Sequence, residues 1–225
     1  MTNDDDAPTV SRALPIAVVR GVLYVLGTAV LSRALLGEGV DPFGGSGPAL
    51  ALIAALLLCD VVGTNLALWK IGRQTPRTLG WIAQHVGRDV VLGIGGFVVC
   101  AAFFALVMLA LGGQEAIDEV TSGIAGYTVA QRVSFVVIGV FGACAAEESL
   151  YRGYLQPALA RKLGVVGGVV VTALLFSALH FNPNPVSLVV KFFFGVIYGV
   201  LALRTGSLVA PGVTHALVWA VIGAA

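Results

Sequence analysis

The sequence predicts an all-α fold, a polytopic transmembrane helix bundle of about seven spans. Of the 225 residues, 58% are hydrophobic and only 11% are charged, and the mean hydropathy is +0.95. A soluble domain carries many more charges on its surface, whereas an apolar run of about 20 residues is long enough to cross a bilayer. The net charge of +1 argues against a nucleic-acid partner.

Apolar runs fill nearly the whole chain and place the spans. We expect them at residues 16–36, 48–69, 90–111, from 129 through the region of Glu147, and at 165–181, 186–203 and 207–223. Residues 1–15 are expected to be a disordered tail, which leaves residues 16–225 as a single transmembrane domain. Arg20, near one end of the first span, is expected to snorkel to the interface. Basic residues cluster in alternate loops, and the positive-inside rule then predicts a cytoplasmic N-terminus.

Two adjacent glutamates and an arginine lie inside one of these apolar runs. An ionisable group in a membrane segment is costly, so it marks a candidate functional site. On a helix, Glu148 and Arg152 are spaced i,i+4 and lie on one face, close enough to pair. Glu147 is turned by about 100° from Glu148 and points elsewhere. We therefore expect Glu147 to carry the chemistry, with a purely structural ion network as the alternative.

Two histidines, His180 and His215, lie in later spans. A turn is expected near Gly164, with Glu147 about 16 residues before it and His180 16 residues after it. In an antiparallel hairpin both then lie roughly 24 Å from the turn, at the same depth. His215 lies only about 14 Å beyond the next inside turn, so simple counting places it less deep. We expect Glu147 and His180 to meet, with His215 as a plausible third member.

A carboxylate and two imidazoles in a low-dielectric cavity can activate water in two ways. They can hold Zn²⁺ or another divalent metal with water as a further ligand, which makes Glu147, His180 and His215 the expected metal ligands. Alternatively, Glu147 is a general base and a histidine stabilises the oxyanion. Either arrangement serves hydrolysis of a peptide bond inside the membrane. Phe176, one turn before His180, either lines a hydrophobic slot or is a core aromatic.

These motifs, in this order, resemble those of the CPBP family, which comprises type II CAAX prenyl proteases and bacteriocin-processing or immunity proteins. The residues that carry the resemblance lie within 129–223 and are Glu147-Glu148-x-x-x-Arg152, Phe176-x-x-x-His180 and His215. The resemblance implies a membrane-embedded catalytic cavity and an endopeptidase, described as a metalloprotease, that acts near the end of a lipidated or membrane-anchored protein substrate. It also implies that Glu147 activates water, that His180 and His215 bind metal or stabilise the oxyanion, and that Glu148 and Arg152 complete the first motif.

One position departs from the family pattern, which usually has Asn or another small polar residue four positions after the last histidine. Here that residue is Trp219. An indole offers only an N–H donor, so it cannot replace an amide oxygen, although it can donate to an oxyanion.

The substrate is not readable from the residues. The candidates are prenylated tails, bacteriocin leaders and C-terminal sorting tails of the myxosortase kind. The Ala-, Gly- and Val-rich composition indicates a high-GC bacterium, and hence its inner (plasma) membrane. Two non-enzyme alternatives stay open, a catalytically silent scaffold or immunity protein, and a proton-coupled transporter in which Asp60 and Lys191 form a charge pair.

Overall fold

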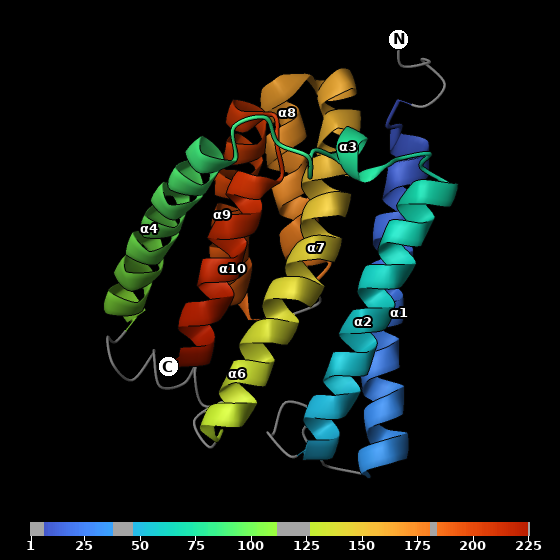
Figure 1. Cartoon of the computed structure of the whole chain (residues 1–225), viewed down its shortest axis with the longest axis vertical. Helices are drawn as coiled ribbons and strands as arrows, with labels where there is room; N and C mark the ends of the chain where they lie inside the picture. The colour runs from blue at the N-terminus through green and yellow to red at the C-terminus, as the bar shows by residue number, and fades with distance from the viewer. Residues whose placement is uncertain (1–6, 38–46, 112–126, 181–183, 225) are drawn as a thin grey trace.

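Helices make up almost the whole of the described chain, as the predicted all-α class requires. The computed structural model describes residues 7–37, 47–111, 127–180 and 184–224 (Figure 1). In chain order the helices are α1 (Val10–Leu36), α2 (Gly47–Lys70), α3 (Pro76–Leu79), α4 (Val86–Leu111), α6 (Val129–Ile138), η3 (Gly139–Ala143), α7 (Cys144–Glu147), η4 (Glu148–Leu155), α8 (Gln156–Ala178), α9 (Pro185–Thr205) and α10 (Val209–Ala224).

The outer surface of the bundle is apolar, as lipid contact requires. Within the described residues, five helical stretches are long and apolar enough to cross a membrane, and Val209–Val221 forms a shorter apolar helix. Large exposed side chains such as Leu23, Leu35, Leu106 and Leu109 cover the outside of α1 and α4. The protein is therefore a multi-pass membrane protein, and the predicted polytopic helix bundle is confirmed.

The first helix begins earlier than the sequence predicted. It starts at Val10 and contains Pro15, so residues 10–15 of the predicted disordered tail are helical. Pro15 is the sixth residue of the helix, beyond the N–H groups that lack intrahelical partners, so it removes one backbone hydrogen bond of α1. Residues 1–6 lie outside the described part of the chain.

The longest helical stretch, Val129–Ala178, folds back on itself at Gly164. Gly164 has φ 74° and ψ 170°, a conformation that is open to glycine and strained for other residues. The turn expected near this residue is confirmed, and it makes the stretch a hairpin. The glutamates lie on the first arm and His180 follows the end of the second.

Two segments of the first arm have π-helical hydrogen bonding, which the sequence did not predict. They are η3 and η4, and they flank the single turn of α7 that ends at Glu147. All eight residues of η4 are buried. π-Helical turns are rare and occur mainly at functional sites. The two π-helical segments therefore mark the adjacent glutamates as candidate functional residues.

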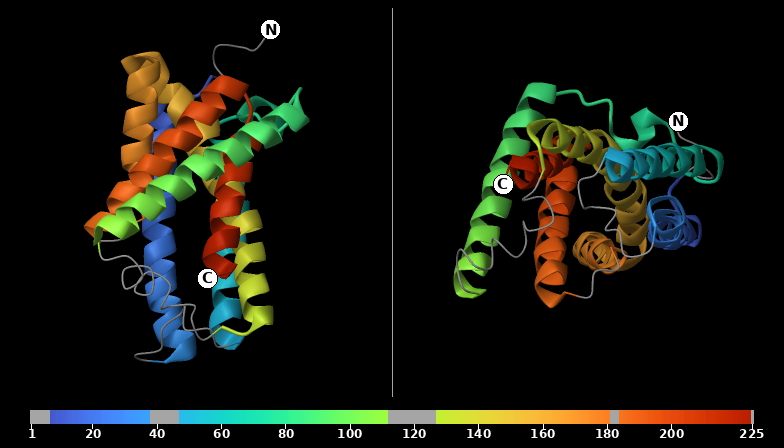
Figure 2. Two further views of the ribbon diagram at one scale, coloured as in Figure 1. Left: turned by 90° about the vertical axis from the view of Figure 1, so that its left-hand side faces the viewer. Right: turned by 90° about the horizontal axis from the view of Figure 1, so that it is seen from below.

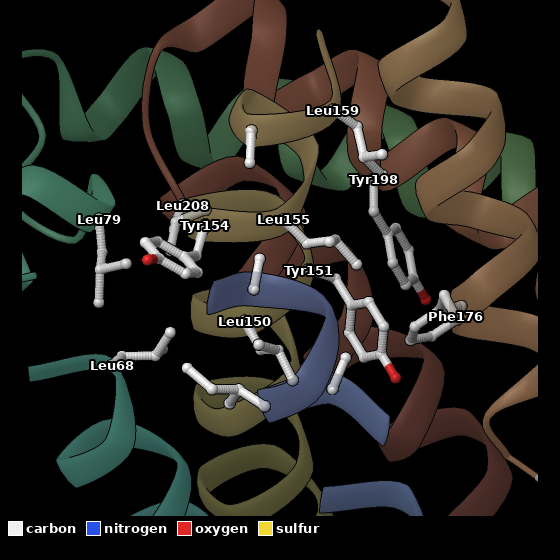
Figure 3. Close-up of a cluster of buried hydrophobic side chains, with 14 of the residues drawn as sticks. Leu68, Leu79, Leu150, Tyr151, Tyr154, Leu155, Leu159, Phe176, Tyr198 and Leu208 are labelled. Atoms are coloured by element: carbon white, nitrogen blue, oxygen red, sulfur yellow. The ribbon is translucent and has the colours of Figure 1, made fainter. Parts of the chain in front are cut away.

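Small residues let the outer helices approach the arm that carries the glutamates. Ala13 and Ala17 of α1 are fully buried and belong to the same core cluster as Leu150, Tyr151 and Tyr154 of η4 (Figure 3). Seen from below, α4 lies at one side of the bundle and α1 at the other, with the motif-bearing helices between them (Figure 2). Close approach at small residues is the usual way in which helices pack inside membranes.

The position of α10 is fixed by its contact with α4. Thr214 donates its hydroxyl to the carbonyl oxygen of Gly93 at 2.7 Å. A Cβ at Gly93 would lie 2.7 Å from the carbonyl oxygen of Ala210, so only glycine allows this approach. The contact holds His215, the residue after Thr214, toward the inside of the bundle.

Candidate active site

The carboxylate of Glu147 lies between two imidazoles. Its Oε1 is 3.7 Å from Nε2 of His180, and its Oε2 is 3.8 Å from Nε2 of His215. Glu147 ends α7, His180 follows α8, and His215 belongs to α10, so three separate segments meet at one point. The structure thus brings together all three residues that the sequence singled out, including His215, which counting had placed less deep.

Each histidine is oriented through its Nδ1 atom. Nδ1 of His180 is hydrogen-bonded to the carbonyl oxygen of Phe176, and Nδ1 of His215 lies 2.9 Å from Oε1 of Glu148. Both partners only accept hydrogen bonds, so Nδ1 carries the proton in each ring. The two Nε2 atoms, which point at Glu147, are therefore lone-pair acceptors when the rings are neutral.

Glu148 and Arg152 form the predicted pair, and Glu148 has a second partner. Arg152 Nη1 lies 3.3 Å from Glu148 Oε1, and Arg152 Nη2 donates to the carbonyl oxygen of Gly195 at 3.3 Å. The side chains of both residues are fully buried. Since the same carboxylate also holds His215, the ion pair does more than fix the helix, because it orients one imidazole of the site.

Phe176 is a core aromatic, one of the two alternatives that the sequence left open. Its ring packs edge-on against His180, with ring centroids 4.7 Å apart. It packs in the same way against Tyr151, with centroids 5.3 Å apart (Figure 3). The guanidinium carbon of Arg152 lies 4.3 Å from the centre of the Phe176 ring. Its side chain therefore supports the histidine and the arginine, while its backbone carbonyl orients His180.

Trp219 lies one turn beyond His215 and contacts it directly. Its indole Nε1 donates to Nε2 of His215 at 3.3 Å. The ring packs against Phe135, with centroids 5.1 Å apart, and fills space that a side chain at Gly139 would occupy. The residue that departs from the family pattern is thus part of the candidate site.

Two charged residues that sequence reasoning placed elsewhere also belong to the site. Arg20 Nη2 lies 3.0 Å from Oε1 of Glu147, and the same guanidinium binds Asp60 through contacts of 2.7, 2.8 and 3.1 Å. The expectation that Arg20 snorkels to the interface was wrong, because its side chain is only 10% exposed and points inward. The suggested pair of Asp60 with Lys191 is likewise replaced by the pair with Arg20.

A signal for Arg20 was present in the sequence. Ala13, Ala17 and Arg20 are spaced i, i+4 and i+7, so they share one face of α1. Small residues in a membrane helix mark the face that packs against protein. An arginine on that face is expected to point into the bundle, and not toward the lipid headgroups.

Residues 129–221 match the family model described as type II CAAX prenyl endopeptidase Rce1-like. This part of the chain is similar to that family. The match covers less than half of the 225 residues, but it includes every motif residue from Glu147 to Trp219. No curated protein matches the chain. The match supports, in general terms, a CAAX-type intramembrane endopeptidase, and α1, α2 and α4 lie outside the part that matches.

Glu147, His180 and His215 are the donor set that a metal ion would need. Binding by all three residues needs the Nε2 lone pairs of both histidines and an oxygen of Glu147. Nε2 of His215 already accepts the N–H of Trp219, and the guanidinium of Arg20 is bound to Glu147. Among the described residues, no group of three or more His, Cys, Asp or Glu side chains is placed to hold a metal ion. In this arrangement the residues do not fit a bound metal.

Charge and exposure indicate what the site of the endopeptidase can do. Glu147 and Asp60 share the single positive charge of Arg20, so one negative charge remains to accept a proton. The His180 side chain is 23% exposed, whereas those of Glu147 and His215 are 9% and 7% exposed. His180 is therefore the most exposed of the three side chains, and His215 is the least exposed.

Proposed function

We propose that the protein hydrolyses a peptide bond near the end of a lipidated or membrane-anchored protein substrate, with Glu147 as the base that activates water. The observation that carries this proposal is the position of the Glu147 carboxylate between the two Nε2 atoms. Separations of 3.7 and 3.8 Å are too long for direct hydrogen bonds. They suit a water molecule that hydrogen-bonds to a carboxylate oxygen and to an imidazole nitrogen at once.

In the proposed reaction, Glu147 takes one proton from this water, and the oxygen forms a bond to the scissile carbonyl carbon. The carbon–nitrogen bond then breaks, and the proton held by Glu147 passes to the leaving amine nitrogen. The negative charge on the carbonyl oxygen needs a hydrogen-bond donor. An Nε2–H on a protonated His180 supplies this donor, since the indole N–H of Trp219 is already bonded to His215.

We propose that the reaction proceeds without a bound metal. Trp219 takes up the imidazole lone pair that a metal would use, and the guanidinium of Arg20 places a positive charge beside Glu147 that opposes a cation there. Both contacts stabilise a carboxylate–imidazole site that acts on water directly, the second of the two arrangements that the sequence left open.

The substrate class is proposed from exposure and composition. His180, the most exposed of the three side chains, belongs to a bundle of apolar helices, which suits a substrate anchored in the bilayer. The high-GC composition favours a bacterial plasma membrane and substrates other than prenylated tails, such as bacteriocin leaders or C-terminal sorting tails.

The test is cleavage by the purified protein in detergent or bilayer discs. Two probes are used, a fluorogenic peptide with a farnesylated cysteine before a three-residue tail, and the same peptide anchored by an apolar helix. We expect the parent to cleave at least one probe and Glu147→Gln to be slower by about 10²–10⁴-fold, since an amide cannot accept the proton. Glu115→Gln, the same change between α4 and α6, is the control.

Two results would count against this function. One is a Glu147→Gln protein that cleaves at nearly the parent rate. The other is a folded parent that cleaves neither probe nor a co-expressed anchored reporter, which favours a silent scaffold.

A further inference from the structure

We infer that Arg20 and Asp60 are positioning residues of the active site, supplied by α1 and α2 from outside the family-matched region. The inference rests on the proposed function, because the residue they position is Glu147, the proposed base. It assigns a role in the reaction to the N-terminal part of the chain. The family match covers residues 129–221 and assigns no role to that part.

The contact is close and shielded from solvent. Arg20 Nη2 reaches Oε1 of Glu147 at 3.0 Å across 127 positions of sequence. The side chains of Arg20, Asp60 and Glu147 are 10%, 6% and 9% exposed. At this burial a charge-assisted hydrogen bond is stronger and less screened than one at a surface.

The contact fixes which oxygen of Glu147 faces each histidine. The last torsion of a glutamate side chain has broad, roughly two-fold minima, so a free carboxylate turns easily. With Oε1 bound to Arg20, Oε1 faces Nε2 of His180 at 3.7 Å and Oε2 faces Nε2 of His215 at 3.8 Å. Arg20 therefore selects one orientation of the carboxylate between the two imidazoles.

Asp60 holds the guanidinium that holds Glu147. It accepts from both Nε and Nη2 of Arg20, a two-pronged geometry that fixes the plane of the guanidinium. Thr64, one turn further along α2, donates to Oδ1 of Asp60 at 3.2 Å and fixes that carboxylate in turn. Asp60 also offsets the charge of Arg20, so Glu147 is held in place and keeps a net negative charge at the site.

A purely structural role would need only part of this arrangement. The pair of Arg20 and Asp60 by itself satisfies both charges and joins α1 to α2. The additional bond from Nη2 to Glu147 is unnecessary for that purpose. The guanidinium carbon of Arg20 also lies 6.0 Å from the centre of the Tyr151 ring of η4.

The experiment compares turnover constants of Arg20→Gln, Arg20→Lys and Asp60→Asn with the parent, using the peptide probe that the parent cleaves. We expect Arg20→Gln to lower kcat by about 10–100-fold with KM within about two-fold, because small displacements of a catalytic group have costs of this size. Arg20→Lys should recover part of the loss, since it keeps the charge and loses the planar fork. Arg33→Gln makes the same change at an exposed position of α1 and should match the parent.

A milder variant covers the case in which Arg20→Gln does not fold. Thr64→Val keeps the volume and all charges and removes only the hydroxyl that holds Asp60. It should lower kcat by a few-fold without changing KM.

The failures of the two proposals can be told apart. A parent that cleaves, together with an Arg20→Gln protein of parental kcat or one altered only in KM, overturns the positioning role and leaves the proposed function intact. A parent that cleaves nothing overturns both. The melting temperatures of Arg20→Gln, Glu147→Gln and the double variant are also compared. If the two changes in melting temperature simply add in the double variant, the inference is overturned, because residues in contact are expected to be coupled.

Discussion

The indole N–H of Trp219 is bonded to Nε2 of His215 at 3.3 Å. Since Nδ1 of His215 donates to Glu148, a directed chain of hydrogen bonds runs from the tryptophan through the histidine to the carboxylate. Tryptophan can only donate, so the chain has one polarity and fixes the tautomer of the neutral ring. The indole has taken a place beside the histidine that is usually held by a small polar side chain in the family.

Replacing Trp219 should separate its N–H from its packing. Trp219→Phe keeps most of the ring and removes the donor, so we expect a several-fold loss of cleavage with little change in thermal stability. Trp219→Asn should keep measurable activity and change the substrate preference. Trp219→Ala should lower both activity and stability, because it opens a gap against Phe135. Cleavage rates and detergent melting temperatures at matched expression measure these effects.

Removing either histidine should be far more damaging than any change at Trp219. His180→Ala and His215→Ala each delete an imidazole that faces Glu147. The same cleavage assay gives the comparison. If His215→Ala cleaves as well as the parent, the site reduces to Glu147 and His180, and the non-enzyme alternatives gain support.

Gly139→Ala should act through Trp219. A Cβ at Gly139 would overlap the six-membered ring of the indole, so the ring must move and its bond to His215 must break. We expect the activity loss of Trp219→Phe with a lower melting temperature, and a smaller effect of Gly139→Ala in a Trp219→Ala background. Gly63→Ala is the matched control, because an added Cβ there meets no atom within 4 Å. If Gly139→Ala has the same effect in the parent as in Trp219→Ala, Gly139→Ala does not act through Trp219.

Arg152→Ala should destabilise the fold by about 3–5 kcal/mol, because it leaves the buried Glu148 without its cation. Adding Glu148→Ala should restore part of the melting temperature but not the activity, since His215 then lacks the partner of its Nδ1. Thermal shift and cleavage are measured on both proteins. Arg161→Ala, at an exposed position of α8, is the control. If Arg152→Ala alone is as stable as the parent, the pair of Glu148 and Arg152 contributes little to the stability of the fold.

The proposed reaction predicts that metal removal leaves activity unchanged. Purified parent should contain much less than one equivalent of zinc or another transition metal, and cleavage should survive a strong chelator. Glu147→Ala, measured in parallel, gives the background metal content. A stoichiometric metal that is lost in Glu147→Ala, with cleavage abolished by the chelator, would restore the metal-dependent alternative.

The meeting of Glu147 and His180 could be predicted because it depends only on helix geometry. Both residues lie the same number of positions from the turn at Gly164, and the antiparallel arms keep them at one depth. His215 was placed too shallow because counting took no account of where α10 begins. The N–H of Leu208 is bonded to the carbonyl oxygen of Gly80, which fixes the start of α10 beside α3.

The ion-pair partner of Arg20 and the π-helical segments could not be predicted in this way, although Ala13 and Ala17 on the same helix face indicated the inward direction of Arg20. An arginine near the end of an apolar run has two outcomes, an inward ion pair or a headgroup contact, and the choice depends on a partner in another helix. For Arg20 that partner is Asp60, which no local pattern connects to it. The π-helical hydrogen bonding of η4 is likewise set by packing around its eight buried residues, since the same residues are compatible with an ordinary α-helix.

The pair between Arg20 and Asp60 has a consequence for how the protein is assembled. Synthesis runs from the N-terminus, so α1 and α2 enter the bilayer before α7 exists. An isolated arginine or aspartate at membrane depth is costly, but the two helices are neighbours in sequence and neutralise each other on insertion. Glu147 arrives later with a charge of its own and meets a cation that is already in place. The early hairpin thus acts as a docking site prepared for the residue that completes the cavity.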